Sequence, residues 1–150
     1  MKTIAFGCDP NAEELKGLMM ERCRSLGYQV VDFGSSDAIY ANTAVKVAHY
    51  VADGKANKGV LICGTGIGVS ISANKVKGAY AALISDVYSA QRAALSNDAN
   101  IACFGAFTLG PKLALALLET WLGLEFDPSS ASAPKVDRIK YYELHPDATA

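Results

Sequence analysis

Short apolar runs and amphipathic stretches alternate along the chain. The apolar runs predict five strands, at 3–6, 30–33, 59–63, 79–84 and 101–104. Apolar residues at helical spacing predict six helices, at 11–26, 42–52, 69–76, 88–95, 113–122 and 136–144. Strands that alternate with helices predict an α/β fold, in which helices cover both faces of a parallel sheet.

The third apolar run, 59–63, is uniformly apolar, as expected for a strand with both faces buried. In such sheets, ligands bind beyond the carboxyl ends of the strands, near the point where the strand order switches direction. The loops 7–9 and 63–68 and the segment after Ile84 are therefore the expected places for a site. Asn11 and Glu14 predict a capping box for the first helix.

The pattern indicates a single domain, residues 1–150. This length suits one domain with a substantial core, and we see no internal repeat. After Gly123 the chain becomes small and polar, and 127–134 read as an exposed loop before the last helix. We expect 124–150 to form a C-terminal loop and short helix.

Composition argues against several classes of function. The net charge is -1 and no basic stripe appears, which argues against nucleic acid or an anionic membrane as the main partner. The first residues become charged too soon for a signal peptide, and no apolar stretch reaches the ~20 residues that span a bilayer. The four cysteines stand singly, which favours free thiols in a reducing cytoplasm over disulfides or a zinc site.

Candidate chemistry centres on the loop Cys63-Gly64-Thr65-Gly66-Ile67-Gly68. Its three glycines allow a sharp turn and a close approach to a ligand. The helix that follows directs its free N–H groups and positive dipole end at the loop, which favours anions and a thiolate. This predicts a base or nucleophile beside an anion hole. The alternative, that Cys63 is a small buried apolar residue, stays open on these residues alone.

Other polar residues give weaker signals. Asp9 follows the first strand, where it orients substrate hydroxyls or caps a helix, and the two roles are compatible. A dinucleotide site is disfavoured because the turn 7–12 lacks the glycine fingerprint, which Asp32 alone does not replace. The only histidines, His49 and His145, fall on a predicted helix surface and in the tail, so neither is a convincing catalyst.

Several short motifs occur in an order shared with one enzyme family. They are Gly7-Cys8-Asp9, Leu61 to Gly68, Ala73-Asn74-Lys75, Tyr88-Ser89-Ala90, Asn97-Asp98-Ala99-Asn100 and Phe104-Gly105. With them the chain resembles the ribose-5-phosphate isomerase B and galactose-6-phosphate isomerase family, from Lys2 to about Ile139. Locally, Tyr40-Ala41-Asn42 and 93–97 resemble its D-erythrulose-4-phosphate isomerase branch.

The resemblance implies a Rossmann-like three-layer α/β/α sandwich with a five-stranded parallel sheet. It also implies aldose-ketose isomerisation of a small sugar phosphate through a cis-enediolate, without metal or cofactor. The catalytic residues would be Cys63, which moves the proton between C1 and C2, and Thr65. A homodimer or homotetramer would carry the site at a subunit interface, with 124–150 packed on the neighbour. The substrate-binding residues would be Asp9, Pro10, Tyr40, Gly64, Gly66, Ile67, Gly68, Ser96, Asn97 and Lys135.

Departures from the family concern the substrate. Members that act on ribose 5-phosphate carry histidines where this chain has Pro10 and Ser96, and the second of these opens the furanose ring. They carry arginine where this chain has Phe107, and an arginine-rich loop at 131–135. A tetrose with phosphate on O4 cannot close a furanose ring, so the sequence predicts a tetrulose 4-phosphate. Lys112, Lys135 and Arg138 are candidates to replace the arginines.

Alternatives remain beside this prediction. In one alternative the substrate is a pentose or hexose phosphate, and in a second alternative it is an unphosphorylated sugar. In a different class, the chain is a non-catalytic partner subunit, although its retention of Cys63 and Thr65 argues against that. A small-ligand or nucleotide-binding module on the same sheet is a further alternative.

Overall fold

The computed structural model describes residues 1–149. Within them a single sheet of parallel strands has the order β2-β1-β3-β5-β4. The strands are β1 (Thr3–Cys8), β2 (Gln29–Asp32), β3 (Lys58–Cys63), β4 (Ala81–Leu83) and β5 (Ile101–Gly105). The helices are η1 (Pro10–Ala12, a 3-10 turn), α1 (Glu13–Ser25), α2 (Tyr40–Ala52), α3 (Ile67–Ala73), α4 (Val87–Leu95), α5 (Pro111–Leu122) and α6 (Ala133–Leu144).

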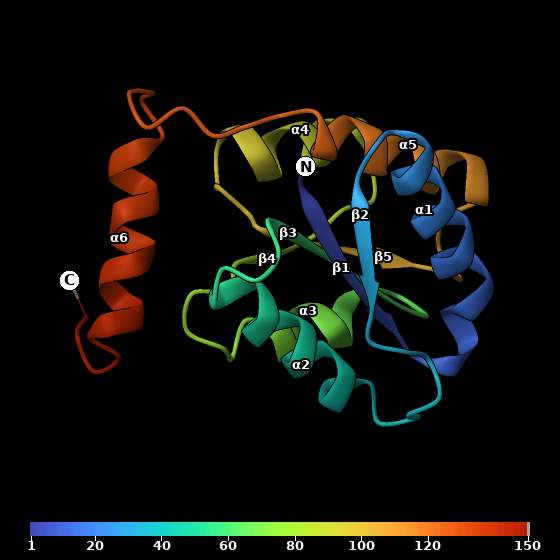
Figure 1. Ribbon diagram of the computed structural model, residues 1–150. Helices are drawn as coiled ribbons and strands as arrows, with labels where there is room; N and C mark the ends of the chain where they lie inside the picture. The colour runs from blue at the N-terminus through green and yellow to red at the C-terminus, as the bar shows by residue number, and fades with distance from the viewer. Residues whose placement is uncertain (150) are drawn as a thin grey trace.

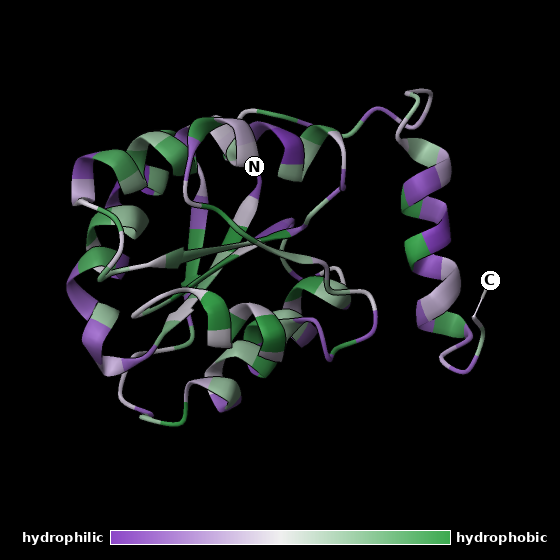
Figure 2. Ribbon diagram, turned by 180° about the vertical axis from the view of Figure 1, so that it is seen from behind, coloured by the Kyte–Doolittle hydropathy of each residue, from purple (hydrophilic) through white to green (hydrophobic). Residues whose placement is uncertain are grey.

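The sheet lies between two layers of helices. Figure 1 shows α1, α4 and α5 over one face and α2 and α3 over the other, which confirms the predicted α/β/α sandwich. Each face has its own core, and Figure 2 shows apolar residues concentrated in the central strands. In β3, Val60 and Ile62 pack toward α1 and α5, whereas Leu61 and Cys63 pack toward α2 and α3. The uniformly apolar run therefore results from burial on both faces.

Strand order puts the expected site at the switch point. β1 leads to β2 on one side of it, and the chain then crosses to β3 on the other side. Cys8 at the end of β1 pairs with Ile62 of β3, and the N–H of Asp9 donates to the Ile62 carbonyl at 3.2 Å. Asp9 and Cys63 therefore leave adjacent strands at the same edge, where the two crossovers diverge.

Several element ends differ from the prediction. Asp9, and not Asn11, provides the cap before α1: its carboxylate accepts the Asn11 N–H at 3.0 Å and caps η1. The predicted capping box at Asn11 and Glu14 is therefore wrong. β4 is shorter than the apolar run from 79 to 84, and α3 begins at Ile67, two residues early.

Helix α6 stands beside the sandwich and belongs to neither layer (Figure 1). The Glu143 carboxylate accepts the Gly78 N–H at 2.7 Å and the Tyr80 hydroxyl at 2.5 Å. Lys140 lies 3.8 Å from Asp98. The side chain of Val136 is buried. A few polar anchors and apolar contacts that include Val136 thus join α6 to the β4 side of the domain.

Candidate active site

Cys63 ends β3 at the rim of the sheet. Its side chain is 4 % exposed, and its sulfur accepts the backbone N–H of Gly66 at 3.1 Å. The backbone of the loop thus provides a hydrogen-bond donor to this sulfur. The loop thus folds back over Cys63 and turns a backbone dipole toward it.

The loop is pinned to the segment that follows β5. The Cys63 carbonyl accepts from the Ala106 N–H, and the Gly64 carbonyl from the Phe107 N–H, both at 2.9 Å. At Gly66, φ is +78°, and a Cβ there would lie 2.7 Å from Leu83 Cδ1. Only glycine combines this backbone conformation with such a close approach. The glycines of the motif therefore serve the fit between this loop and its neighbours.

Two aromatic rings lie on the remaining glycines of the loop. A Cβ on Gly64 would lie 2.8 Å from Phe107 Cδ2, and a Cβ on Gly68 would collide with the ring of Tyr40. The structure therefore places Tyr40 at the loop, where sequence resemblance expected it. The sequence indicated Phe107 as one of the positions that choose the substrate, because family members carry arginine there, but did not include it among the site residues. This departure from the family was the available signal.

Asp9 is the acidic residue beside Cys63. Its side chain is buried, with 8 % exposed, and one carboxylate oxygen accepts the Asn11 N–H. Among residues 1–149, no donor contacts the other oxygen, Oδ2. Pro10 occupies the first position of η1, where its missing N–H leaves no donor unsatisfied. The helix-capping role and a free oxygen for a ligand thus coexist in Asp9.

Thr65 and Ile67 form the turn into α3. The Thr65 hydroxyl oxygen accepts the Ile67 N–H at 3.2 Å, and because it accepts there, its hydrogen stays available for donation. The Ile67 side chain is half-exposed at the mouth of the loop. Both residues therefore lie in the turn that follows Cys63, where the Thr65 hydroxyl can act as a donor.

The other cysteines are unsuited to act as a base. Burial raises the pKa of the Cys8 and Cys23 thiols to about 12, and it also raises the pKa of Cys103. All three side chains are at most 1 % exposed. They remain neutral thiols at physiological pH, so Cys63, at the loop, is the candidate among the four.

Three of the expected substrate residues do not lie near Cys63 within one chain. Ser96 and Asn97 precede β5, and the Asn100 carbonyl accepts the N–H of Gly59 near the start of β3. Gly105, at the other end of β5, pairs with Cys63. A strand of this length separates its ends by about 13 Å. Asn97 instead shares a cavity of about 150 Å³ with Val136, Ile139 and Lys140 of α6. Lys135 lies in the first turn of that helix.

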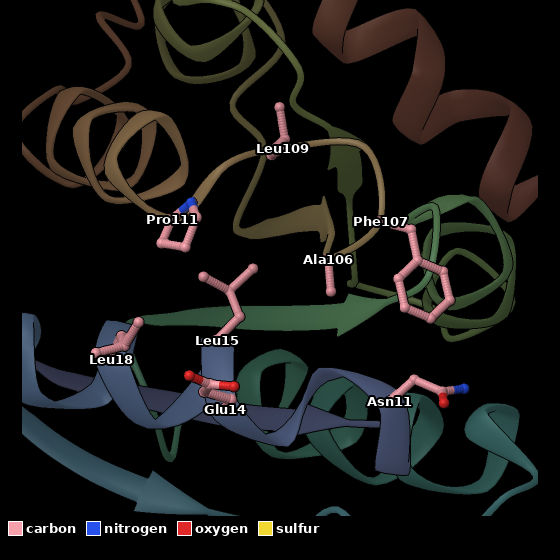
Figure 3. A pocket seen from close by; sticks show the side chains of 8 residues that line it. All are labelled: Asn11, Glu14, Leu15, Leu18, Ala106, Phe107, Leu109 and Pro111. Atoms are coloured by element: carbon pink, nitrogen blue, oxygen red, sulfur yellow. The ribbon is translucent and has the colours of Figure 1, made fainter.

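A cavity of about 180 Å³ lies next to the Asp9 and Cys63 segments, between α1 and the loop before α5 (Figure 3). It is lined by Asn11, Glu14, Leu15, Leu18, Ala106, Phe107, Leu109 and Pro111. Among residues 1–149, no group of three His, Cys, Asp or Glu side chains is placed to hold a metal ion. Nor does any helix of this part combine the length and hydropathy that crossing a membrane requires.

Fold and site together define a Rossmann-like α/β/α protein whose switch point carries a cysteine loop and a buried aspartate. The sequence pattern of the family described as Ribose/Galactose Isomerase matches residues 4–139, and the chain belongs to this family. It is an aldose-ketose isomerase of the sugar-phosphate class.

Relatives with different named substrates are similarly close. The chain is 44% identical over 147 residues to a D-erythrulose-4-phosphate isomerase of Pectobacterium atrosepticum, covering 95% of this chain and 96% of the relative. It is 57% identical over 104 residues to D-erythrulose-4-phosphate isomerase 2 of Mycolicibacterium smegmatis, covering 69% and 68%. It is 46% identical over 140 residues to a ribose-5-P isomerase B of Listeria innocua, covering 91% and 94%.

Solved structures give the same family. Clostridium thermocellum ribose-5-phosphate isomerase B superposes with a TM-score of 0.91 at 36% identity, covering 97% of this chain and 99% of that one. The family and the fold are thus settled, whereas the choice among its sugar phosphates depends on residues around the site.

Proposed function

We propose that the chain interconverts D-erythrulose 4-phosphate and D-erythrose 4-phosphate, with Cys63 as the base. The observation that carries the proposal is the geometry of Cys63. Its sulfur lies at the switch point, accepts the Gly66 N–H at 3.1 Å and has Asp9 on the adjacent strand. A proton beside a carbonyl is weakly acidic, so the base must be close and the developing oxyanion must meet preorganised donors.

The reaction needs two proton movements. The Cys63 thiolate removes a proton from C1 of the ketose, and the electron pair forms the C1–C2 double bond while O2 becomes the enediolate oxygen. The Cys63 thiol then returns the proton to C2 and becomes a thiolate again. In the same exchange the O1–H bond breaks, its electron pair forms the C1=O bond of the aldose, and its proton passes to O2. The Gly66 N–H already donates to the Cys63 sulfur and the Ile67 N–H to the Thr65 hydroxyl oxygen. The oxyanion would therefore take its donors from the remaining backbone N–H groups of the loop and from the Thr65 hydroxyl. Losing one such donor typically costs on the order of 3 kcal/mol in the transition state.

The tetrulose substrate is supported by Ser96. A serine is a poor acid for opening a furanose ring, but a tetrose with phosphate on O4 has no free hydroxyl to close that ring. Two relatives carry the name D-erythrulose-4-phosphate isomerase, which agrees with this choice. A ribose-5-P isomerase B at similar identity makes a pentulose 5-phosphate the alternative substrate.

The site is proposed to be shared between two copies of the chain. Ser96, Asn97 and Lys135 contact the substrate only if a second copy presents them to Cys63, because β5 separates them from it within one chain. Exposed apolar side chains near the loop support such a contact, and they are Ile67, Ile71, Leu83, Val87 and Tyr88. We therefore expect a homodimer or homotetramer in which 124–150, with α6, packs on a neighbouring subunit.

An isomerisation assay on D-erythrulose 4-phosphate, D-ribulose 5-phosphate and their unphosphorylated counterparts tests the proposal. Wild type should turn over the tetrulose phosphate best, and Cys63→Ala should lose at least a thousandfold in kcat. Cys23→Ala is the matched control, because Cys23 lies on α1 in the other core and should keep kcat.

Three outcomes would contradict the proposal in different ways. Unchanged kcat in Cys63→Ala would exclude Cys63 as the base. Efficient turnover of ribulose 5-phosphate without turnover of the tetrulose phosphate would keep the isomerase and replace its substrate. A chain that is inactive alone but active with a related chain would be a partner subunit.

A further inference from the structure

The apolar side chain of Phe107 is exposed to solvent beside the Cys63 loop. It is 72 % exposed, although its ring touches the backbone of Gly64. Its own N–H donates to the Gly64 carbonyl, and the preceding N–H, of Ala106, donates to the Cys63 carbonyl. These two bonds fix the backbone that carries the ring relative to the cysteine. The ring therefore lies outside the core and beside the reactive loop.

The ring also forms one end of the 180 Å³ cavity. Figure 3 shows Phe107 and Asn11 at one end and Leu18 and Pro111 at the other. Asn11 follows Asp9 and Pro10, so this end of the cavity adjoins both site segments. The ring of Phe107 therefore borders both the Cys63 loop, at Gly64, and this cavity.

The cavity is chemically unsuited to a phosphate. Of the eight residues that line it, only Glu14 is charged, and its charge is negative. Leu15, Leu18, Leu109 and Pro111 make the remainder mostly apolar. A phosphate dianion in the cavity would lose hydration without gaining a cation, and it would be repelled by the carboxylate.

We propose that Phe107 is a specificity-determining residue that limits the chain length of the substrate. This proposal rests on the proposed function, because the length of the substrate is counted from C1 and C2, which lie at Cys63. A tetrulose phosphate ends before the ring. One more carbon pushes the phosphate of a pentulose against the ring and toward Glu14, which disfavours the longer substrate.

The test compares kcat/KM for D-ribulose 5-phosphate with kcat/KM for D-erythrulose 4-phosphate in wild type, Phe107→Ala and Phe107→Tyr. Removal of the ring should raise this ratio at least tenfold, and Phe107→Tyr, which keeps the ring, should leave it within twofold. Both constants come from one preparation, so the fraction of folded enzyme cancels in the ratio. If Phe107→Ala is inactive, thermal-shift protection by the two phosphates gives the same comparison in binding.

An unchanged ratio in active Phe107→Ala, or equal relative protection in the inactive variant, would overturn the proposal. Gel filtration accompanies the assay, and dissociation of the oligomer with an unchanged ratio would make Phe107 an interface residue. Failure of the proposed function looks different: it is read from Cys63→Ala and from wild-type turnover, neither of which depends on Phe107.

Discussion

The Lys16 ammonium lies 2.7 Å from Asp32 Oδ1, with side-chain exposures of 4% and 38%. The same carboxylate oxygen accepts the Gly34 N–H at 2.8 Å, and the Gly34 carbonyl accepts the Cys8 N–H at 3.3 Å. This chain of contacts ties α1 to the end of β1, one residue before Asp9. A buried lysine thus holds together the backbone that presents the acidic group of the site.

Removal of Asp32 and removal of Lys16 should lower the free energy of unfolding by different amounts. Asp32→Ala leaves a buried ammonium without its counter-ion, and we expect a loss of about 3 kcal/mol or more in the free energy of unfolding. Lys16→Met keeps the apolar stem and leaves a carboxylate that water already reaches, so the expected loss is about 1 kcal/mol. Urea denaturation of both variants checks the order, and a smaller loss for Asp32→Ala would contradict it.

Two glycines should respond in opposite directions to alanine. Gly17 is exposed inside α1 and has no atom within 4 Å of an added Cβ. Gly17→Ala should therefore raise the free energy of unfolding by about 0.5–1 kcal/mol and leave kcat unchanged. Gly66→Ala meets both a positive φ and the Leu83 and Phe104 contacts, so it should lose more than about 2 kcal/mol.

The Gly66 variant should also lower kcat, because the backbone shift that the added Cβ requires would move the N–H that donates to the Cys63 sulfur. Denaturation and steady-state kinetics on the same two proteins separate the effects. A Gly66→Ala enzyme with normal stability and turnover would mean that the loop has more room than the structure gives it.

Local patterns predicted most of the fold and the centre of the site. Each buried strand is a continuous apolar run, and the glycine turn after Leu61-Ile62-Cys63 marked the loop before any contact was known. The cap of the first helix was assigned wrongly because Asn11 and Asp9 both suit that position. The choice depends on the hydrogen bond from Asp9 back to β3, which is a contact between distant segments.

Contacts between segments that are far apart in the sequence account for the features that the local pattern did not predict. The sequence around Gly64 and Gly68 does not predict that the rings of Phe107 and Tyr40 lie against them. Similarly, Ser96 and Cys63 fall at opposite edges of the sheet, because Ser96 precedes β5 whereas Cys63 ends the neighbouring parallel strand β3. The helical signal of α6 was correct, but its place outside both layers has no counterpart in the local pattern.

Stability should fall in alkaline solution, partly because of Cys23. Its thiol pKa is about 12 in the folded protein against an ordinary value of 9.0. Above pH 9 the unfolded state loses the proton first, so the free energy of unfolding falls by up to ~1.4 kcal/mol per pH unit until about pH 12. Below pH 9 the thiol is protonated in both states and contributes no slope.

Cys23→Ala removes this contribution and isolates it from other titrating groups. The stability difference between wild type and Cys23→Ala should stay constant from pH 6 to 8 and shrink steadily from pH 9 to 10.5. Chemical denaturation at each pH gives the two curves. Parallel curves over the whole range would show that Cys23 titrates normally in the folded protein.

Glu143 should control whether α6 stays docked on its own chain. Its carboxylate makes the bonds to Gly78 and Tyr80, and the Tyr80 hydroxyl is thereby held protonated, with its pKa raised by burial and by this bond. Glu143→Ala removes both bonds, and we expect the free energy of local opening of α6 to fall by about 2 kcal/mol.

Hydrogen exchange measures that opening directly. Amides of α6 should exchange roughly thirtyfold faster in Glu143→Ala, whereas those of β3 and β5 should keep the wild-type rate, because the two cores do not include Glu143. Asp137→Ala is the matched control, since Asp137 is an exposed carboxylate on the same helix. Equal protection of α6 in the two variants would mean that Val136 and other apolar contacts hold the helix without its polar anchor.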